Sequence, residues 1–236
     1  MEQVTAYEVL KRLRESAFLA ILVVAVLLGG FVLAEPQIGH SATATDQFII
    51  TQTVTSEISF VATAADVVMD TSIPGITGGT ANGSTQVRVY TNDSAGYSMT
   101  IAASGTPAMQ GNTQGGSIAD YTPSSSFVPD YAHSVGVNTG EFAYTVSAST
   151  TSDLAQKFLD NGSNLCNTGS ADTSGSASCW YGLSSTATST INRTSETTAS
   201  GATTTIFFRT QITASPSPAI PEDTYTATTT LTATTN

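Results

Sequence analysis

Beyond residue 34, histidine and lysine, two of the side chains that carry out acid–base catalysis, are scarce. His133 is the one histidine that lies securely beyond the N-terminal apolar region, and Ser134 follows it directly. A nucleophile and its general base must come within hydrogen-bond reach of each other. Neighbouring residues on a strand point to opposite faces, which places this pair badly for such chemistry. We therefore interpret His133 as a loop histidine without a catalytic role.

Paired carboxylates occur at Asp66 with Asp70 and at Glu222 with Asp223. Glycosidases need two carboxyl groups about 5–10 Å apart, but scattered acidic residues produce such pairs by chance. The sequence has no Asp-x-Asp-x-Asp-Gly calcium loop, and its glycine pairs lack the Lys-Ser/Thr ending of a phosphate-binding loop. We predict that the protein is not an enzyme and has no catalytic residues, no cofactor and no metal site.

Two cysteines, Cys166 and Cys179, flank a loop of small polar residues, and Trp180 and Tyr181 follow directly. An even number of cysteines in an exported chain predicts a disulfide bond, whereas a metal site would need further ligands nearby. The two aromatic rings could stack on sugars as glycan contacts. A lone tryptophan beside a disulfide is also typical of core packing, which the sequence favours.

The first 34 residues predict a signal peptide or a membrane anchor. Lys11, Arg12 and Arg14 precede the apolar run 18–28, after which Gly29 and Gly30 break the pattern. An apolar core of this length is typical of a signal peptide, with cleavage after Ala34 or Ala44. The longer stretch 17–34 just reaches the length of a spanning helix. Both alternatives keep the start inside and place the body outside the membrane, at the cell surface or in the extracellular space.

The charge of the chain excludes one class of partner. The formal net charge is −11, and basic residues are nearly absent after Arg14. Phosphate backbones repel such a surface, so we expect no nucleic-acid partner. Contact with the membrane is expected only through the N-terminal helix. The acidic residues are spread out, which is typical of a soluble, self-repelling surface.

The exported part shows the period-two alternation of apolar and polar residues that is typical of strands. Residues 86–92 and 97–103, joined by a turn at 93–96, predict a β-hairpin. Residues 152–159 predict one or two turns of helix, and residues 73–84 a loop rich in glycine and proline. The predicted strands are 48–55, 57–63, 86–92, 97–103, 141–148, 203–212 and 224–235.

These elements predict an all-β protein. Short strands with Gly/Pro-rich loops and almost no helix favour an antiparallel β-sandwich of the Ig-like or jelly-roll type. A long loop-rich insertion, roughly residues 104–200, interrupts the strands. We interpret residues 45–236 as a single elaborated domain, with a two-domain division near residue 133 as the alternative.

Two segments resemble exported bacterial surface β-sandwich proteins, a group that includes spore-coat and pilin-like secreted proteins. Residues 87–101 resemble a Thr-Asn-x-x-x-Gly-Tyr turn between two strands, and residues 221–234 resemble the closing strand of such proteins. The second match has Asp223-Thr224 where those proteins usually have glycine. The resemblance covers about 30 residues and implies a surface or filament role without catalytic residues.

Three functions remain as hypotheses. The first is a non-enzymatic extracellular structural protein of a bacterial envelope, including a fibre subunit; the second is a carbohydrate-binding or adhesive module; the third is a glycan-active enzyme. The expected partners are cell-surface components or other copies of the chain. The last strand, 224–235, either closes its own domain or adds to an exposed edge of the next copy.

Overall fold

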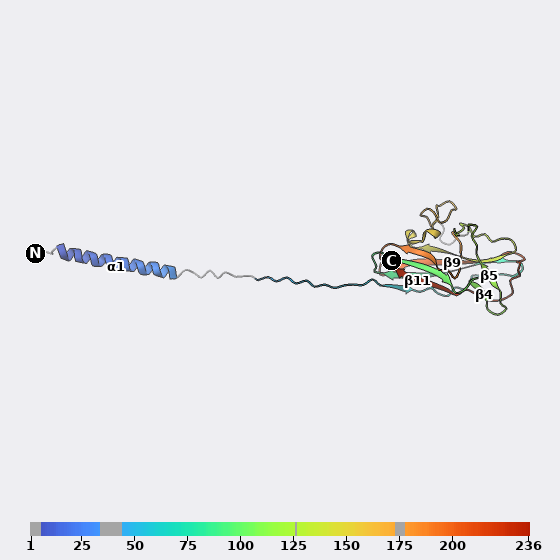
Figure 1. The fold of residues 1–236 in the computed structure, drawn as a ribbon, viewed down its shortest axis with the longest axis horizontal. Helices are drawn as coiled ribbons and strands as arrows, with labels where there is room; N and C mark the ends of the chain where they lie inside the picture. The colour runs from blue at the N-terminus through green and yellow to red at the C-terminus, as the bar shows by residue number, and fades with distance from the viewer. Residues whose placement is uncertain (1–5, 34–43, 126, 173–177) are drawn as a thin grey trace. The chain divides into compact units, whose positions relative to one another are not determined.

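The computed structural model describes residues 6–33, 44–125, 127–172 and 178–236 (Figure 1). The chain divides into two compact units, Met1–Gln52 and Thr53–Asn236, and each is described by itself. The first contains one apolar helix, and all the described strands lie in the second. The prediction of a mostly β protein preceded by an apolar helix is therefore confirmed.

Helix α1 spans Ala6–Leu33 and is longer than the sequence predicted, because it continues through Gly29 and Gly30. Its part Tyr7–Gly30 has 24 residues and is long and apolar enough to cross a membrane. At about 1.5 Å per residue this part measures about 36 Å, which exceeds a hydrocarbon core of about 30 Å. Signal sequences pass the same test, so the helix indicates export or membrane association. Cleavage after Ala34 falls outside the described residues.

The large sheet has eight strands, seven of which follow one path and one of which pairs only with β6. In spatial order they are β1 (Ile58–Ala62), β2 (Gly79–Thr91), β9 (Ala202–Ile212), β6 (Gly140–Ala148), β5 (Ser117–Asp120), β4 (Met109–Gly111) and β10 (Tyr225–Thr226), with β7 (Tyr181–Gly182) beside β6. The prediction of a purely antiparallel arrangement is wrong at one place, because β5 and β6 are parallel.

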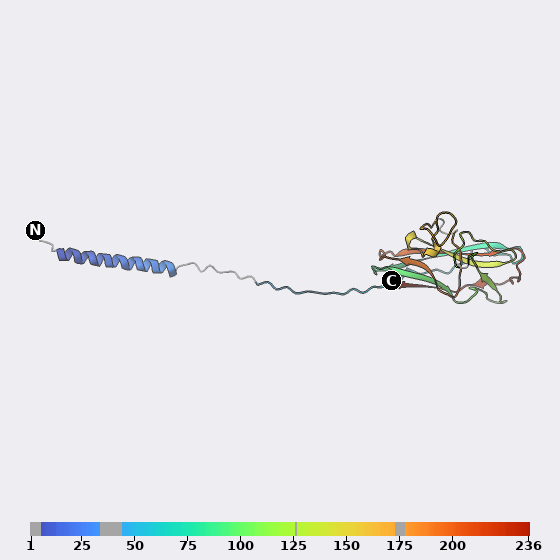
Figure 2. The same cartoon turned by 45° about the horizontal axis from the view of Figure 1, so that its top comes forward.

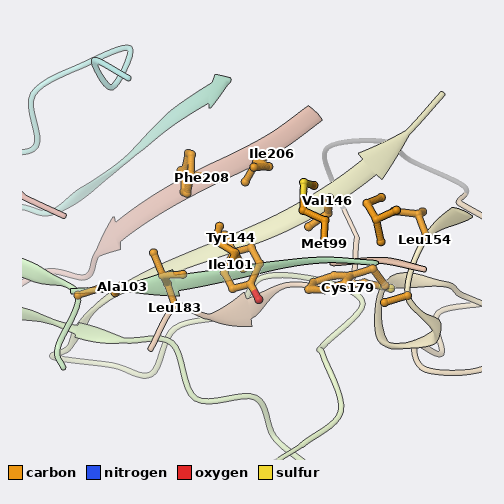
Figure 3. Packing of buried hydrophobic residues seen from close by; sticks show 14 of the residues in the cluster. Met99, Ile101, Ala103, Tyr144, Val146, Leu154, Cys179, Leu183, Ile206 and Phe208 are labelled. Carbon is orange, nitrogen blue, oxygen red and sulfur yellow. The ribbon is translucent and has the colours of Figure 1, made fainter. Parts of the chain in front are cut away.

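The small sheet has three antiparallel strands, in the order β11 (Thr229–Thr235), β3 (Tyr97–Ala103) and β8 (Thr188–Arg193). Figure 2 shows the strands from a second side. Alternate residues of both sheets are buried in one apolar cluster, to which β3 contributes Met99 and Ile101 and β6 contributes Tyr144 and Val146 (Figure 3). The core therefore lies where the inward faces of the two sheets meet.

The predicted hairpin 86–103 is wrong, although both of its strands form. Strand β2 pairs with β1 and β9, whereas β3 pairs with β11 and β8, so the turn between them crosses from one sheet to the other. Asp93 accepts a hydrogen bond from the backbone N–H of Ala95 and thereby fixes this turn. Gly96 follows with a φ of +82°, and a Cβ atom here would collide with the carbonyl oxygen of Arg193.

Two further boundaries differ from prediction. Strand β2 begins at Gly79, inside the predicted loop 73–84, because β9 pairs with it from Gly79 to Val89. At Gly83 a Cβ atom would lie only 2.5 Å from the side chain of Val67, so glycine lets the neighbouring segment pass closely over the strand. Residues 48–55 form no strand, and their apolar side chains are exposed.

The other elements follow the predictions closely. Strand β1 lies within the predicted segment 57–63, and β6 and β9 cover the predicted segments 141–148 and 203–212. The predicted helical stretch forms two 3₁₀ turns, η1 (Thr151–Asp153) and η2 (Gln156–Phe158). The segment 104–200 is more than an insertion, because it contributes β6 at the centre of the large sheet.

The predicted last strand divides into β10 and β11. Strand β11 pairs with β3 of the same chain over seven residues, from Thr229 opposite Ala103 to Thr235 opposite Tyr97. Its partly buried side chains are those of Leu231, Ala233 and Thr235, which face the core side. The chain thus uses β11 within its own domain.

Candidate binding pocket on the outer face of the large sheet

Alternation along β9 creates a second, smaller apolar layer on the outer face of the large sheet. Ile206 and Phe208 face the main core, so Phe207 and Arg209 face outward. Phe207 packs there against the buried residues Tyr121, Ala143 and Trp180. The loops that carry Tyr121 and Trp180 come from the predicted insertion, and they cover part of the outer face.

His133 lies inside this layer rather than in an open loop. Its ring centroid lies 4.8 Å from that of Tyr121 and 5.5 Å from that of Trp180, and its Nδ1 lies 3.1 Å from Oε1 of Gln211. Burial, together with the charge of Arg209, lowers the pKa of His133 to about 4. The described bond of its ring is to Gln211, so the structure does not bring His133 and Ser134 together as a base and a nucleophile.

Asp130 fixes the loop that carries Tyr121. Its carboxylate accepts hydrogen bonds from Tyr121 Oη at 2.7 Å and from Ser124 Oγ at 2.6 Å and N at 2.9 Å. Burial opposes its ionisation, but these hydrogen bonds together lower the pKa of Asp130. Asp130 also bridges to Trp180 through two backbone hydrogen bonds. The two loops are thereby tied to each other and to the sheet.

Arg209 joins the aromatic layer to a polar pocket. Its guanidinium carbon lies 4.4 Å from the centroid of the Trp180 ring, and its Nε donates to Asn82 Oδ1 at 2.8 Å. Among the described residues, no carboxylate lies within salt-bridge distance of Arg209. Burial lowers the pKa of this guanidinium, which nevertheless stays charged at neutral pH.

The pocket itself has a volume of about 360 Å³ and contains both polar and apolar groups. Asp70 stands on its rim and accepts a hydrogen bond from the backbone N–H of Asn82 at 2.8 Å. The buried Trp180 Nε1 has no hydrogen-bond partner among the described residues. The lining residues are Asp70, Asn82, Gly83, Ser84, Trp180, Phe207, Phe208 and Arg209.

The two predicted glycan contacts occupy different positions. Trp180 is only 1% exposed, and Arg209 covers its ring. Tyr181 is half-buried, and Lys157 Nζ lies 3.8 Å from the centroid of its ring. The structure brings Trp180 into the pocket but not Tyr181, and a cationic side chain lies over one face of each ring.

The predicted disulfide is confirmed. Cys166 and Cys179 are bonded, with their Cα atoms 5.6 Å apart, and both residues are buried in the main core. The bond therefore ties the segment around Cys166 to Cys179, which directly precedes Trp180.

One member of each predicted acidic pair serves local structure. Asp70 accepts from Asn82, and Asp223 accepts from the backbone N–H groups of Thr113, Gln114 and Thr224. The part of the chain that the structure describes has no group of three or more His, Cys, Asp or Glu side chains arranged for a metal ion.

Sequence reasoning missed Arg209 and Asn82 as pocket residues. The available signal was the alternation of β9, which places Arg209 and Phe207 on the face opposite Ile206 and Phe208. The pairing of Asn82 with Arg209 arises from the register between β2 and β9. That register joins residues 127 positions apart, so no local pattern announces it.

Comparison with known families, with curated proteins and with solved structures finds no match to this chain. Function must therefore be argued from the geometry alone.

Proposed function

We propose that this chain is a non-enzymatic structural protein of a bacterial envelope, which stands outside the membrane and acts as a surface or fibre subunit. The observation that carries the proposal is that one chain contains both an N-terminal apolar helix and a disulfide-bonded β domain. Disulfides persist in oxidising compartments, and Lys11, Arg12 and Arg14 at the start of the helix favour a cytoplasmic start.

The architecture supports the same proposal. Two sheets that share one core are consistent with an elaborated Ig-like or jelly-roll-type sandwich. Such scaffolds use their strands for rigidity and their edges for association. The many short polar side chains and the net charge of −11 suit a solvated outer surface.

The location can be tested on intact cells. A membrane-impermeant biotin reagent should label Lys157, the one lysine outside the N-terminal helix, when the full chain is expressed in a bacterial host. Lysis should raise the labelling of Lys11 but not that of Lys157. If Lys157 is labelled only after lysis, the domain lies inside and the proposal fails.

A second candidate function is supported by the pocket at Arg209. We infer that it would hold an acidic glycan, because the pocket contains the Arg209 guanidinium, which has no carboxylate partner among the described residues, beside the polar side chain of Asn82. A carboxylate on a sugar matches a guanidinium in charge and geometry.

An array of acidic and neutral glycans tests this function. Arg209→Gln should lose binding to acidic glycans, whereas Arg88→Gln, an exposed arginine on the neighbouring strand β2, should keep it. Equal binding by both variants, or no binding by the unchanged protein, contradicts the adhesive function and leaves the structural one standing.

A further inference from the structure

Residues 48–54 have the sequence pattern of a strand but lie outside every strand that the structure describes. Phe48, Ile50 and Val54 share one face of the alternating pattern and are 81%, 83% and 80% exposed. Three large, highly exposed apolar side chains on one face of a segment form an unusual surface for a soluble protein. Such a segment can bury that face by adding to a sheet.

Strand β11 offers an edge of matching length. Backbone hydrogen bonds join Asn236 N to Gly96 O and Ser104 N to Thr228 O, so the even-numbered residues of β11 bond toward β3. The N–H and C=O groups of Leu231 and Ala233 consequently point to the other side, where no described strand pairs with them, although β1 of the large sheet lies near β11. Their side chains are only partly buried against the core.

The other sheet edges are less suited to accept a strand. The ladder of β1 with β2 is irregular between Phe60 and Ala62, and β10 has only two residues. The outer side of β8 is already engaged, because Ala155 N donates to Thr190 O and Leu154 bridges to Ile191. Strand β11 is thus the long regular edge that remains.

The chain just after the exposed segment is held in place. Asn92 donates from Nδ2 to Thr55 O at 3.1 Å and accepts at Oδ1 from Glu57 N at 2.6 Å, while Thr91 Oγ1 donates to Glu57 O at 2.7 Å. A chain reversal that laid residues 48–54 along β11 of the same copy would have to break these bonds. The geometry therefore favours the β11 edge of a different copy.

We propose that residues 48–54 of one copy add as a strand to the free edge of β11 in a second copy of this chain. The proposal rests on the structural function proposed above and names its partner. Main-chain hydrogen bonds form with Leu231 and Ala233, and the face with Phe48, Ile50 and Val54 covers the partly buried apolar residues of that edge. Repetition along a row of copies builds a fibre or a surface layer.

Cysteine cross-linking of the full chain in detergent tests the contact directly. Thr51 lies on the outward face of the added strand, as does exposed Thr232 on β11, and cross-strand neighbours come within about 5.5 Å of each other. One preparation carries Thr51→Cys, and a second carries Thr230→Cys, Thr232→Cys or Thr234→Cys so that every register is sampled. Mixing the two and oxidising gently should give disulfide-linked dimers.

The matched control places the second cysteine at Ser189, an exposed position on β8 at the opposite border of the same sheet. Cross-linking there that equals the yield at β11 contradicts the proposal. Thr51→Cys and the β11 cysteine are also combined in one chain. A disulfide that forms between these two cysteines within a single chain overturns the proposal in favour of pairing within the copy. No cross-link at any of the three β11 positions also overturns it.

A second comparison uses the two neighbouring isoleucines, both highly exposed. Ile50→Asp alters the docking face and should reduce the dimer yield about tenfold or more, whereas Ile49→Asp alters the opposite face and should leave most of it. An equal loss of dimer yield in both variants would show that the segment associates through nonspecific apolar contact and not as a strand in register. An unchanged dimer yield in both variants would show that the segment takes no part in the contact. If Lys157 is labelled on intact cells but the chain stays monomeric, the strand contact is refuted and the proposed function is not. If Lys157 is labelled only after lysis, the proposed function is refuted.

Discussion

At the scale of single residues, Arg193 has the largest structural role of the few cations in the domain. Its Nη1 lies 2.6 Å from Asp153 Oδ2, and the two side chains are only 17% and 11% exposed. The same guanidinium donates to the backbone oxygens of Ser195 and Glu196. Arg193 therefore neutralises a buried carboxylate and closes a turn at once.

Arg193→Ala should lower the free energy of unfolding by about 2 kcal/mol, because Asp153 would remain buried without its partner. Chemical denaturation of the full chain in detergent measures the change. Arg88→Ala serves as the control, since Arg88 is exposed and should change stability by less than about 0.5 kcal/mol. Equal effects in the two variants would contradict the assigned role of Arg193.

The buried histidine predicts a response to acid. Because the pKa of His133 is lowered to about 4, the folded protein keeps it neutral at pH 5, where the unfolded chain, with a pKa near 6.5, binds a proton. Lowering the pH from 7 to 5 should therefore cost about 1 kcal/mol of stability through this residue, after discounting for its partial exposure. For a domain of this size the change is about 2–4 °C in Tm.

The measurement compares the protein with His133→Gln at both pH values. Arg209 and Asp130 face the ring, and the half-buried Asp120 and Glu141, whose pKa values are raised, change stability in the opposite direction on acidification. Because Asp120 and Glu141 are present in both proteins, their contribution to the change in Tm cancels in the comparison. If the Tm of both proteins falls by the same amount between pH 7 and pH 5, His133 is not responsible for the loss of stability.

At the scale of elements, the stretch 86–103 shows where sequence patterns stop being informative. The alternation of Val87 and Val89, then of Tyr97, Met99 and Ile101, fixes which side chains face the core, and these are buried as expected. A hairpin and a crossing between two sheets bury the same alternate positions. The difference lies in the partners β9 and β11, which come more than a hundred residues later.

Removal of residues 222–236 should abolish the cooperative fold, because β11 supplies one edge strand of the small sheet and partly covers the core. Loss of the thermal transition and early proteolysis are the expected readouts. Point variants refine the result: Leu231→Ala, at a partly buried position, should cost about 1–2 kcal/mol, and exposed Thr230→Ala less than about 0.5 kcal/mol. A truncated domain that melts normally would show that β11 is dispensable.

The disulfide links a long loop to the core. Replacing both Cys166 and Cys179 by serine should lower the free energy of unfolding by about 3 kcal/mol, since the closed loop spans a sequence separation of 13 and both positions are buried. Denaturation of the full chain with and without the variant measures the change. Reduction of the unchanged protein should reproduce it; if only the serine variant is destabilised, packing rather than the cross-link is responsible.

At the scale of the whole molecule, the sequence predicted the apolar helix, the β-rich body and the disulfide. Each of these depends on composition or on short-range alternation. The pocket was not predictable, because Asn82, Trp180 and Arg209 meet only through pairings across the sheet. The exposed segment 48–55 was predicted as a strand because its residues alternate between apolar and polar. Alternation indicates that a segment is able to form a strand, but it does not show whether a sheet edge is present for that segment to pair with.

The net charge of −11 predicts how copies of the chain approach one another. Like-charged domains repel, and salt screens that repulsion over about 10 Å at 0.1 M. The yield of the cross-linked dimers between Thr51→Cys and the β11 cysteines should therefore rise from 0.02 M to about 0.3 M salt, where the Debye length is shorter. A yield that falls with salt would instead indicate that attraction between opposite charges holds the copies together.

The hold of Asn92 on Thr55 and Glu57 also has a mechanical meaning. If the helix is fixed in a membrane, a pull on the domain enters through residues 44–57 and reaches the Asn92 amide and the Thr91 hydroxyl first. Behind them, β1 runs antiparallel to β2, and their hydrogen bonds lie across any pull that acts along β1. The load then shears the ladder, so its bonds share the force instead of opening one after another. The entry point of the domain is thus built to bear tension.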